Sequence, residues 1–200
     1  MKAVFLDRDG VICRNRNDYV KNWDEFQFLP HSREAIARLT EAGLPVIVIS
    51  NQSAINRGLT SADEVENIHR HMISEVKAWG GSIARVYYCP HKPDEHCICR
   101  KPQPGMLLQA ALELGVNLDE SFLIGDAVTD IQAAQAVGVK AYLVMTGRGK
   151  RQDLGAFTPE MDCFNVASNL WQAVDNILKL ESLATQHHKW AMVQREMARS

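Results

Sequence analysis

The chain contains 200 residues, which is the usual size of one globular domain. Lys and Arg number 22 against 24 Asp and Glu, so the formal net charge of -2 offers no electrostatic support for a nucleic-acid or anionic-membrane partner. The apolar fraction of 46% is ordinary, and the chain lacks the stretch of about 18 to 20 apolar residues that a membrane span needs. We therefore expect a globular protein that binds neither nucleic acid nor a membrane.

The amino-terminal apolar run is too short for the core of a signal peptide, because Asp7 interrupts it. This start predicts a cytoplasmic protein. Cys13 and Cys163 are isolated, whereas the other three cysteines are crowded between Cys89 and Cys99. In a reducing compartment such crowding indicates metal binding and not a disulfide framework.

Short β-branched runs alternate with longer segments of helical period, which is typical of parallel strands joined by crossover helices. In chain order, the sequence predicts a strand over 3–6, a helix over 32–42, a strand over 44–50, a helix over 61–79, a strand over 83–88, a helix over 104–114, a strand over 121–125, a helix over 129–137, a strand over 140–145 and a helix from 168 onward. The expected fold class is α/β, with one mostly parallel sheet flanked by helices.

The spacing of these elements predicts one domain over residues 1–182, with a cysteine-rich loop over 89–99, and a helical or partly disordered tail over 183–200. No large apolar pattern is left over for a subunit interface, so we expect a monomer.

Polar clusters follow the predicted strands, at the sheet edge where open α/β folds bind their ligands. They are Asp7-Arg8-Asp9-Gly10, Ser50-Asn51-Gln52-Ser53, Arg100-Lys101-Pro102, and Gly125-Asp126 with Asp130. Each cluster alone is weak evidence for a functional site. The D-x-D-G sequence of the first cluster, for example, is commonly a turn or a helix cap. Together they supply the nucleophile, proton donor, cation and metal-binding carboxylates that phosphoryl transfer needs.

In this order the clusters resemble the four motifs of the haloacid dehalogenase superfamily of aspartate-nucleophile phosphatases. The resemblance implies a Rossmann-like fold in which Asp7 attacks phosphorus and Asp9 acts first as acid and then as base. It also implies that Ser50 and Lys101 hold the phosphate oxygens.

The same resemblance implies a catalytic Mg²⁺ bound by Asp7, Asp126 and the backbone carbonyl of Asp9. Asp130 either orients this metal site or forms a salt bridge with Lys101. An alternative is that Asp130 is a surface carboxylate in the first turn of a helix, where the dipole favours negative charge.

A second cluster has the spacing C-x-H-x5-C-x-C and comprises Cys89, His91, Cys97 and Cys99. Three thiols and one imidazole can complete a tetrahedral shell around Zn²⁺, which leaves no open coordination position. The sequence therefore predicts a structural zinc site. The neighbouring His96 is expected to be a solvated loop residue.

This loop narrows the resemblance to the histidinol-phosphatase-like branch, and within it to the heptose bisphosphate phosphatases. The resemblance implies that the protein removes the 7-phosphate of D-glycero-D-manno-heptose 1,7-bisphosphate. Histidinol phosphate or another small sugar phosphate remains an alternative substrate, because Ala54, Asn56 and Ala127 depart from the family pattern. A polynucleotide phosphatase and an inactive zinc-stabilised scaffold are two further alternatives.

The gaps between the motifs, residues 11–49 and 54–100, are too short to hold a cap domain over the site. The segment 15–30 is expected to form a flap, with Phe26 and Phe28 packed in the core. The resemblance implies substrate contacts for Arg100 and for the flap residues near Asp18, Tyr19 and Val20. The polar residues Asn51, Gln52 and Ser53 after a predicted strand, and the loop cation Arg57, are further candidate substrate contacts. Further loop cations suit a second anionic group on the substrate; they are Arg14, Arg16, Arg148, Lys150 and Arg151.

Overall fold

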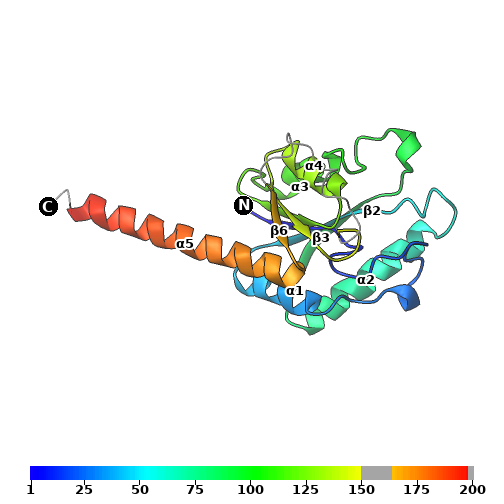
Figure 1. Ribbon diagram of the computed structural model, residues 1–200, viewed down its shortest axis with the longest axis horizontal. Helices are drawn as coiled ribbons and strands as arrows, with labels where there is room; N and C mark the ends of the chain where they lie inside the picture. The colour runs from blue at the N-terminus through cyan, green and yellow to red at the C-terminus, as the bar shows by residue number, and fades with distance from the viewer. Residues whose placement is uncertain (150–163, 198–200) are drawn as a thin grey trace.

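A sheet of six parallel strands forms the centre of the protein, which the computed structural model describes over residues 1–149 and 164–197 (Figure 1). The strand order is β3-β2-β1-β4-β5-β6. The strands are β1 (Val4–Leu6), β2 (Val46–Asn51), β3 (Ile83–Cys89), β4 (Phe122–Gly125), β5 (Lys140–Val144) and β6 (Phe164–Ala167). The helices are α1 (Ser32–Glu41), α2 (Ala62–Ala78), α3 (Gly105–Leu114), α4 (Val128–Gln135) and α5 (Leu170–Met197), with short 3-10 helices η1 (Trp23–Glu25) and η2 (Pro93–Glu95).

The predicted α/β class is confirmed, and the five predicted strands and five predicted helices lie where the sequence placed them. Helix α2 shows why local signals sufficed: the Ser61 hydroxyl caps it by accepting a hydrogen bond from the Glu64 N–H at 3.1 Å. Strand β6 was not predicted. It is a short edge strand with Asn165 and Val166 exposed, so it lacks a continuous apolar run.

Side chains that alternate along the strands build two cores, one on each face of the sheet. Leu6 and Val48 face the layer of helices α1, α2 and α5, whereas Phe5 and Ile47 face helices α3 and α4. Both cores are fully buried at these positions. The sheet is therefore covered on both sides, and polar side chains can gather only at its edges and strand ends.

The order in which the chain adds strands to the sheet reverses at β1. It runs outward from β1 through β2 to β3 and then returns to place β4 against the other side of β1. Ligands in open α/β folds bind at such a switch point, beyond the carboxyl ends of the strands. The residues that follow β1, β2 and β4 are therefore brought to one place.

Helix α5 packs its first turns on the sheet and then extends away from it (Figure 1). Leu170, Val174 and Ile177 are buried in the core. The guanidinium carbon of Arg38 lies 4.5 Å from the centre of the Trp171 ring, so a cation–π contact ties α5 to α1. None of the helices in the described ranges combines the length and apolarity that crossing a membrane requires.

Residues 15–30 form the expected flap beside the sheet. Phe26 is buried and Phe28 is half-buried against the same core, which confirms their predicted packing. Trp23 stacks on Phe26 with 4.9 Å between ring centres. The two gaps between the motifs, which the structure describes completely, each hold one α-helix, one short 3-10 helix, strand residues and loops, so neither gap contains a cap domain.

Candidate active site

Asp7 and Asp9 follow directly after β1, at the switch point of the sheet. The chain turns sharply at Gly10, whose φ of 99° is a conformation that side chains disfavour. A Cβ atom at Gly10 or at Gly147 would overlap the carboxylate of Asp126. These two glycines therefore allow the backbone to close around Asp126.

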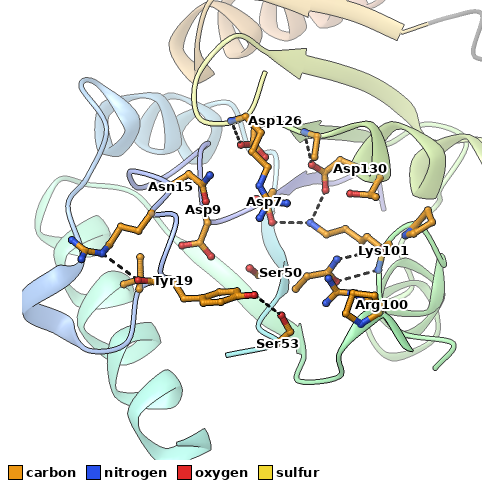
Figure 2. A pocket seen from close by; sticks show the side chains of 18 residues that line it. Asp7, Asp9, Asn15, Tyr19, Ser50, Ser53, Arg100, Lys101, Asp126 and Asp130 are labelled. Carbon is orange, nitrogen blue, oxygen red and sulfur yellow. Dashed lines mark hydrogen bonds and ion pairs between the residues drawn. The ribbon is translucent and has the colours of Figure 1, made fainter. Parts of the chain in front are cut away.

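A cleft of about 260 Å³ opens over these residues (Figure 2). Its walls come from the ends of β1, β2 and β4, the flap and the cysteine-rich loop. The lining residues are Asp7, Asp9, Asn15, Arg16, Tyr19, Val20, Ser50, Asn51, Ser53, Pro93, Arg100, Lys101, Pro102, Asp126, Ala127, Thr129, Asp130 and Arg148.

Lys101 is buried at the floor of the cleft with its ammonium group fully engaged. Its Nζ lies 2.7 Å from the Asp7 carboxylate and 2.6 Å from that of Asp130, and it donates to the Ile49 carbonyl at 2.9 Å. Burial alone would lower the pKa of Lys101, but the carboxylates of Asp130 and Asp7 raise it above its ordinary value. Lys101 is therefore a permanent positive charge beside Asp7.

Asp130 forms the salt bridge with Lys101 that was one of its two expected roles. Its other carboxylate oxygen accepts a hydrogen bond from the Ala127 N–H at 3.0 Å, at the start of α4. The side chain is almost completely buried, so the alternative of a surface carboxylate is wrong. Asp130 thus fixes Lys101 in place.

Three buried carboxylates meet at this point, because Asp7, Asp126 and Asp130 each bring an oxygen within 4.8 Å of the others. Burial, Asp130 and Asp9 raise the pKa of Asp7 to about 6 even though Lys101 opposes the shift. Burial and the charges of Asp7 and Asp130 raise the pKa of Asp126 to about 8. One ammonium group does not balance this negative charge, and the oxygen-only donor set fits Mg²⁺.

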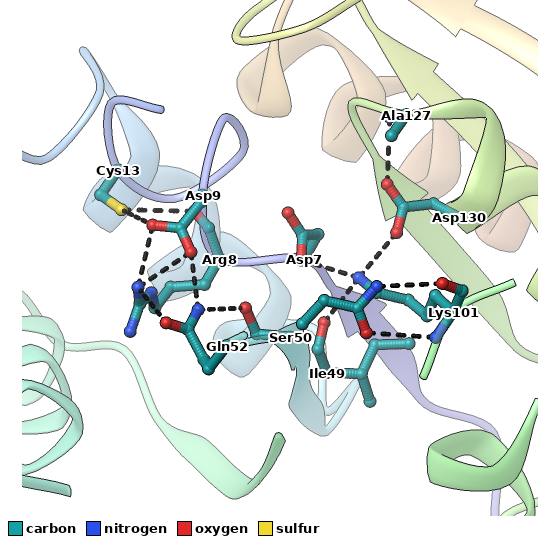
Figure 3. Close-up of polar contacts among 11 residues, drawn as sticks. Asp7, Arg8, Asp9, Cys13, Ile49, Ser50, Gln52, Lys101, Ala127 and Asp130 are labelled. Carbon is teal, nitrogen blue, oxygen red and sulfur yellow. Dashed lines mark hydrogen bonds and ion pairs between the residues drawn. The ribbon is translucent and has the colours of Figure 1, made fainter. Parts of the chain in front are cut away.

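Asp9 belongs to a second polar cluster, on the side of Asp7 that is opposite Lys101 (Figure 3). Its two oxygens accept from the Arg8 guanidinium at 3.0 and 2.8 Å, and one also accepts from the Gln52 amide at 2.7 Å. Burial works against the charged form, but Arg8 and these hydrogen bonds lower the pKa of Asp9. Figure 3 shows Asp7 between the cluster that holds Asp9 and the cluster that holds Lys101.

Residues at the end of β2 and directly after it line the cleft and form hydrogen bonds with Lys101 and with the flap. Asn51 clamps the backbone of Lys101, since its amide donates to the Lys101 carbonyl at 3.0 Å and its oxygen accepts from the Lys101 N–H at 3.1 Å. Ser50 faces the cleft and is nearly buried. The Ser53 hydroxyl donates to the Tyr19 hydroxyl at 3.5 Å, which joins the flap to β2.

Three expected substrate contacts do not line the cleft. Asp18 is exposed and pairs with Arg16 and Lys21, Arg57 is exposed, and Gln52 is buried behind Asp9. Val20 lines the cleft, as expected for the flap. No substrate or catalytic role was expected for several other residues that line it, namely Asn15, Pro93, Pro102 and Thr129. Their only sequence signal was their closeness to the motifs.

The loop cations divide in a similar way. Arg16 and Arg148 line the cleft, whereas Arg14 does not. Lys150, Arg151 and Cys163 lie outside the described residues. The Arg148 N–H donates to the Asp126 carboxylate at 2.7 Å, which ties the loop after β5 to the carboxylate cluster.

The structure shows the surroundings of the three residues that depart from the family pattern. Ala127 lines the cleft as the residue before α4, and Ala54 is buried. Asn56 donates to Glu95 at 2.8 Å and so ties the segment after β2 to the cysteine-rich loop.

Cys89, His91, Cys97 and Cys99 gather at the end of β3 as the spacing predicted. Their ligand atoms lie within 4.8 Å of one another, and the distances from the Cys89 sulfur to the His91 Nδ1 and to the Cys99 sulfur are 3.4 and 3.2 Å. Burial opposes the charged form, but hydrogen bonds from Cys99 and the Arg100 N–H lower the pKa of Cys97 to about 7. The set has the donor types and the closeness that a tetrahedral Zn²⁺ site needs.

This loop also holds Arg100 at the rim of the cleft. The Arg100 guanidinium donates at 2.9 Å to the carbonyl of His91, which is one of the four candidate zinc ligands. Lys101 follows directly in the sequence. The cysteine-rich loop therefore positions two cations of the cleft.

Comparison with known proteins places this geometry in a family. Residues 98–173 match the model of the HAD-hydrolase-like family. The D-glycero-beta-D-manno-heptose-1,7-bisphosphate 7-phosphatase of Pseudomonas aeruginosa is 45% identical over 157 residues, which cover 78% of this chain and 88% of the relative. The enzyme of the same name from Neisseria meningitidis serogroup B is 42% identical over 151 residues, covering 76% and 81%.

A solved structure agrees with these sequences. The D,D-heptose 1,7-bisphosphate phosphatase of Bordetella bronchiseptica, complexed with magnesium and phosphate, superposes with a TM-score of 0.84 at 37% identity and covers 90% of this chain and 99% of its own. The chain is a phosphatase that belongs to the D-glycero-beta-D-manno-heptose-1,7-bisphosphate 7-phosphatase family of HAD-like hydrolases.

Proposed function

We propose that the protein removes the 7-phosphate of D-glycero-D-manno-heptose 1,7-bisphosphate through an aspartyl phosphate on Asp7. The observation that carries this proposal is the position of the Asp7 carboxylate. It lies on the cleft floor between the ammonium group of Lys101 and the carboxylate of Asp126, with Asp9 lining the same cleft. A phosphoryl group above Asp7 would meet a nucleophile, a cation and a proton donor at once.

The proposed reaction has two steps. Despite burial, Arg8 lowers the pKa of Asp9 in the free protein, so Asp9 must take up a proton as the anionic phosphate ester binds. An Asp7 oxygen then attacks phosphorus, the bond to the sugar oxygen breaks, and Asp9 gives that oxygen its proton. Water then attacks the phosphorus of the aspartyl phosphate while Asp9 takes up the proton of the water, and inorganic phosphate leaves. Lys101 and Ser50 bind the non-bridging oxygens in both steps and do not change their own protonation.

A divalent cation completes the proposed site. Asp7, Asp126 and the backbone carbonyl of Asp9 would hold Mg²⁺, which supplies positive charge to the carboxylate cluster and to the phosphoryl oxygens. The three crowded carboxylates support this assignment, because their ionised forms are disfavoured without a cation.

Phosphate release from a panel of substrates tests the proposed specificity. The panel holds both anomers of the heptose 1,7-bisphosphate, histidinol phosphate and a simple sugar monophosphate, each with and without Mg²⁺. We expect the highest kcat/KM for one heptose bisphosphate anomer. A preference for histidinol phosphate would replace the proposed substrate, and an absence of Mg²⁺-dependent turnover on every member would contradict the proposed mechanism.

Binding of Mg²⁺ is expected to strengthen as the pH rises from 6 to 8.5. With a pKa of about 8, Asp126 is largely protonated at pH 6, so the cation must displace a proton there. We expect the apparent affinity at pH 6.5 to be at least about tenfold below that at pH 8.5. Calorimetric titrations in two buffers of different ionisation enthalpy measure both the affinity and the released proton.

The variant Asp126→Asn provides the control, because it removes the group that titrates. It should bind Mg²⁺ weakly at every pH and release less proton. Affinity of the unchanged protein that does not vary over this pH range would contradict the assignment of the site.

Zinc in the cysteine-rich loop is expected to support substrate binding through Arg100. Purified protein should hold about one tightly bound zinc ion per chain. The variant Cys97→Ser should lose it and release the His91 carbonyl that holds Arg100, so KM for the bisphosphate should rise about tenfold. Elemental analysis and steady-state kinetics measure the two effects.

The matched control is His96→Asn, which changes an exposed residue of the same loop outside the ligand set. It should retain the zinc and the KM of the unchanged protein. Fresh protein that contains no zinc would rule out this role of the loop.

A further inference from the structure

A buried polar cluster lies behind Asp9 and is not used in the proposed reaction. Arg8 is completely buried, and Gln52 and His69 are only 1% and 2% exposed. Arg8 follows Asp7 in the sequence, Gln52 follows β2, and His69 lies in the middle of α2. Three separate segments thus contribute to one polar contact set inside the protein.

Arg8 and Gln52 close a ring of hydrogen bonds with Asp9 (Figure 3). The Arg8 guanidinium donates to both Asp9 oxygens and to the Gln52 amide oxygen, the last at 2.9 Å. The Gln52 amide nitrogen in turn donates to Asp9 at 2.7 Å and to the Ser50 hydroxyl at 2.8 Å. Because the amide oxygen and nitrogen have different partners, Gln52 can take only one orientation.

His69 contacts the side of the guanidinium that faces away from this ring. Its Nε2 lies 3.3 Å from the Arg8 Nη1. Arginine has only donors, so Nε2 must accept, and the imidazole is neutral with its proton on Nδ1. Burial and the neighbouring Arg8 charge lower the pKa of His69 to about 3, which keeps the ring in this acceptor form.

His69 is held by packing, since its Nδ1 is buried and forms no hydrogen bond within the described residues. Its neighbours Ile68 and Met72 are fully buried in the core beneath the sheet, and its ring lies 5.4 Å from that of Tyr88. The side chain of Asp9, by contrast, is 21% exposed, because one edge faces the cleft. The hydrogen bonds between Arg8 and its neighbours are therefore expected to set the direction in which the Asp9 side chain points into the cleft.

We propose that His69 is a positioning residue that orients Asp9 toward the leaving-group oxygen by fixing the Arg8 guanidinium. This inference rests on the proposed role of Asp9 as the acid of the first step. Within the described residues His69 forms no hydrogen bond with Asp9 and does not line the cleft, so we expect its effect to pass through Arg8. If the protonated carboxyl group of Asp9 is turned away from the leaving oxygen, Asp7 can still attack phosphorus, but Asp9 no longer delivers its proton.

Two substrates with different leaving groups separate this role from a purely structural one. A sugar alkoxide needs a proton to depart, whereas the aryl group of p-nitrophenyl phosphate departs as a stable anion. The ratio kcat/KM covers the steps up to loss of the leaving group, so it reports proton delivery directly. The heptose bisphosphate and p-nitrophenyl phosphate are therefore compared in each variant at saturating Mg²⁺.

In His69→Phe, which keeps an aromatic ring but lacks the acceptor, we expect kcat/KM for the heptose bisphosphate to fall about tenfold, with KM nearly unchanged. For p-nitrophenyl phosphate the expected loss is less than about threefold. His69→Gln restores an acceptor and should recover most of the activity on the sugar substrate. His71→Phe is the matched control: this exposed residue of the same helix stacks on Trp23, phenylalanine keeps that ring contact, and both ratios should stay unchanged.

Arg8→Lys gives a second test if His69→Phe does not fold. Lysine keeps the charge but cannot contact Asp9, Gln52 and His69 together, so the same selective loss on the sugar substrate is expected. Thermal denaturation of each variant shows whether it is folded at the assay temperature.

Asp9→Asn separates failure of this inference from failure of the proposed function. It should lose about 10² to 10⁴-fold on the sugar substrate and much less on the aryl substrate. If Asp9→Asn shows this selectivity but His69→Phe and Arg8→Lys lose both activities equally, the positioning role is wrong. If Asp9→Asn itself loses both equally, the role of Asp9 as the acid is wrong.

Discussion

The variant Asp7→Asn is expected to lose at least about 10³-fold in kcat on every phosphate ester. An amide oxygen is a poor nucleophile, so the first step of the proposed reaction cannot occur. Asparagine has nearly the same shape as aspartate, so the loss should not reflect a changed cleft. Phosphate release at saturating Mg²⁺ measures the effect.

The folded state should tolerate this change well. Burial raises the pKa of Asp7 to about 6, so above that pH its ionisation destabilises the metal-free folded protein, and asparagine removes this contribution. Lys101 keeps its ion pair with Asp130 at 2.6 Å. We therefore expect the Tm of the metal-free variant at pH 8 to be no lower than that of the unchanged protein, while the increase in Tm caused by Mg²⁺ becomes much smaller.

Asp24→Asn, on the exposed surface of η1, serves as the control and should change neither kcat nor the response to Mg²⁺. Full Mg²⁺-dependent hydrolysis by Asp7→Asn would show that another group attacks phosphorus. Covalent phosphate trapped by acid quench should be present in the unchanged protein and absent from the variant.

The variant Lys101→Met is expected to be impaired in both stability and activity. Methionine fills a similar volume but leaves the buried carboxylates of Asp7 and Asp130 without their cation. Removing one partner of a buried ion pair costs about 3 to 5 kcal/mol, because an uncompensated charge remains. For a domain of this size such a loss lowers Tm by roughly 10 °C.

Activity should fall by about 10² to 10³-fold, because Lys101 no longer stabilises the charge that develops on the phosphoryl oxygens. The pKa of Asp7 should also rise further once its cationic neighbour is gone, so the remaining activity should need a higher pH. Thermal denaturation and a pH profile of kcat/KM measure these effects.

Lys179→Met is the matched control, because it breaks an exposed ion pair with Asp175 on α5. An exposed pair of this kind contributes about 0 to 1 kcal/mol, so little change is expected. If Lys101→Met and Lys179→Met were equally stable and equally active, the ammonium group at the cleft floor would have no special role.

Much of the architecture was readable from the sequence because it depends on local properties. The apolar run of β2 and the capping residue Ser61 of α2 mark their elements without reference to the rest of the chain. The meeting of Asp7, Ser50 and Asp126 also follows from the sequence, since parallel strands place their carboxyl ends at one edge.

The tertiary structure decided which side chains near the motifs face the cleft. Tyr19 has a φ of 67°, so the flap turns there, and Tyr19 lines the cleft while Asp18 points to solvent. In a loop, the direction of a side chain depends on backbone angles that no periodic pattern specifies. The substrate contacts assigned to neighbouring residues could therefore not be separated from the sequence alone.

The contact between His69 and Arg8 was hidden for a related reason. A histidine within an amphipathic helix has no local signal that shows whether it is buried, and its partner lies 61 positions away. Only the packing of α2 against the sheet brings the two together. The sequence by itself determined the elements and the motif residues, because spacing and period are local. The orientation of Asp9 and the choice of cleft residues depended on contacts between distant segments, which only the folded chain creates.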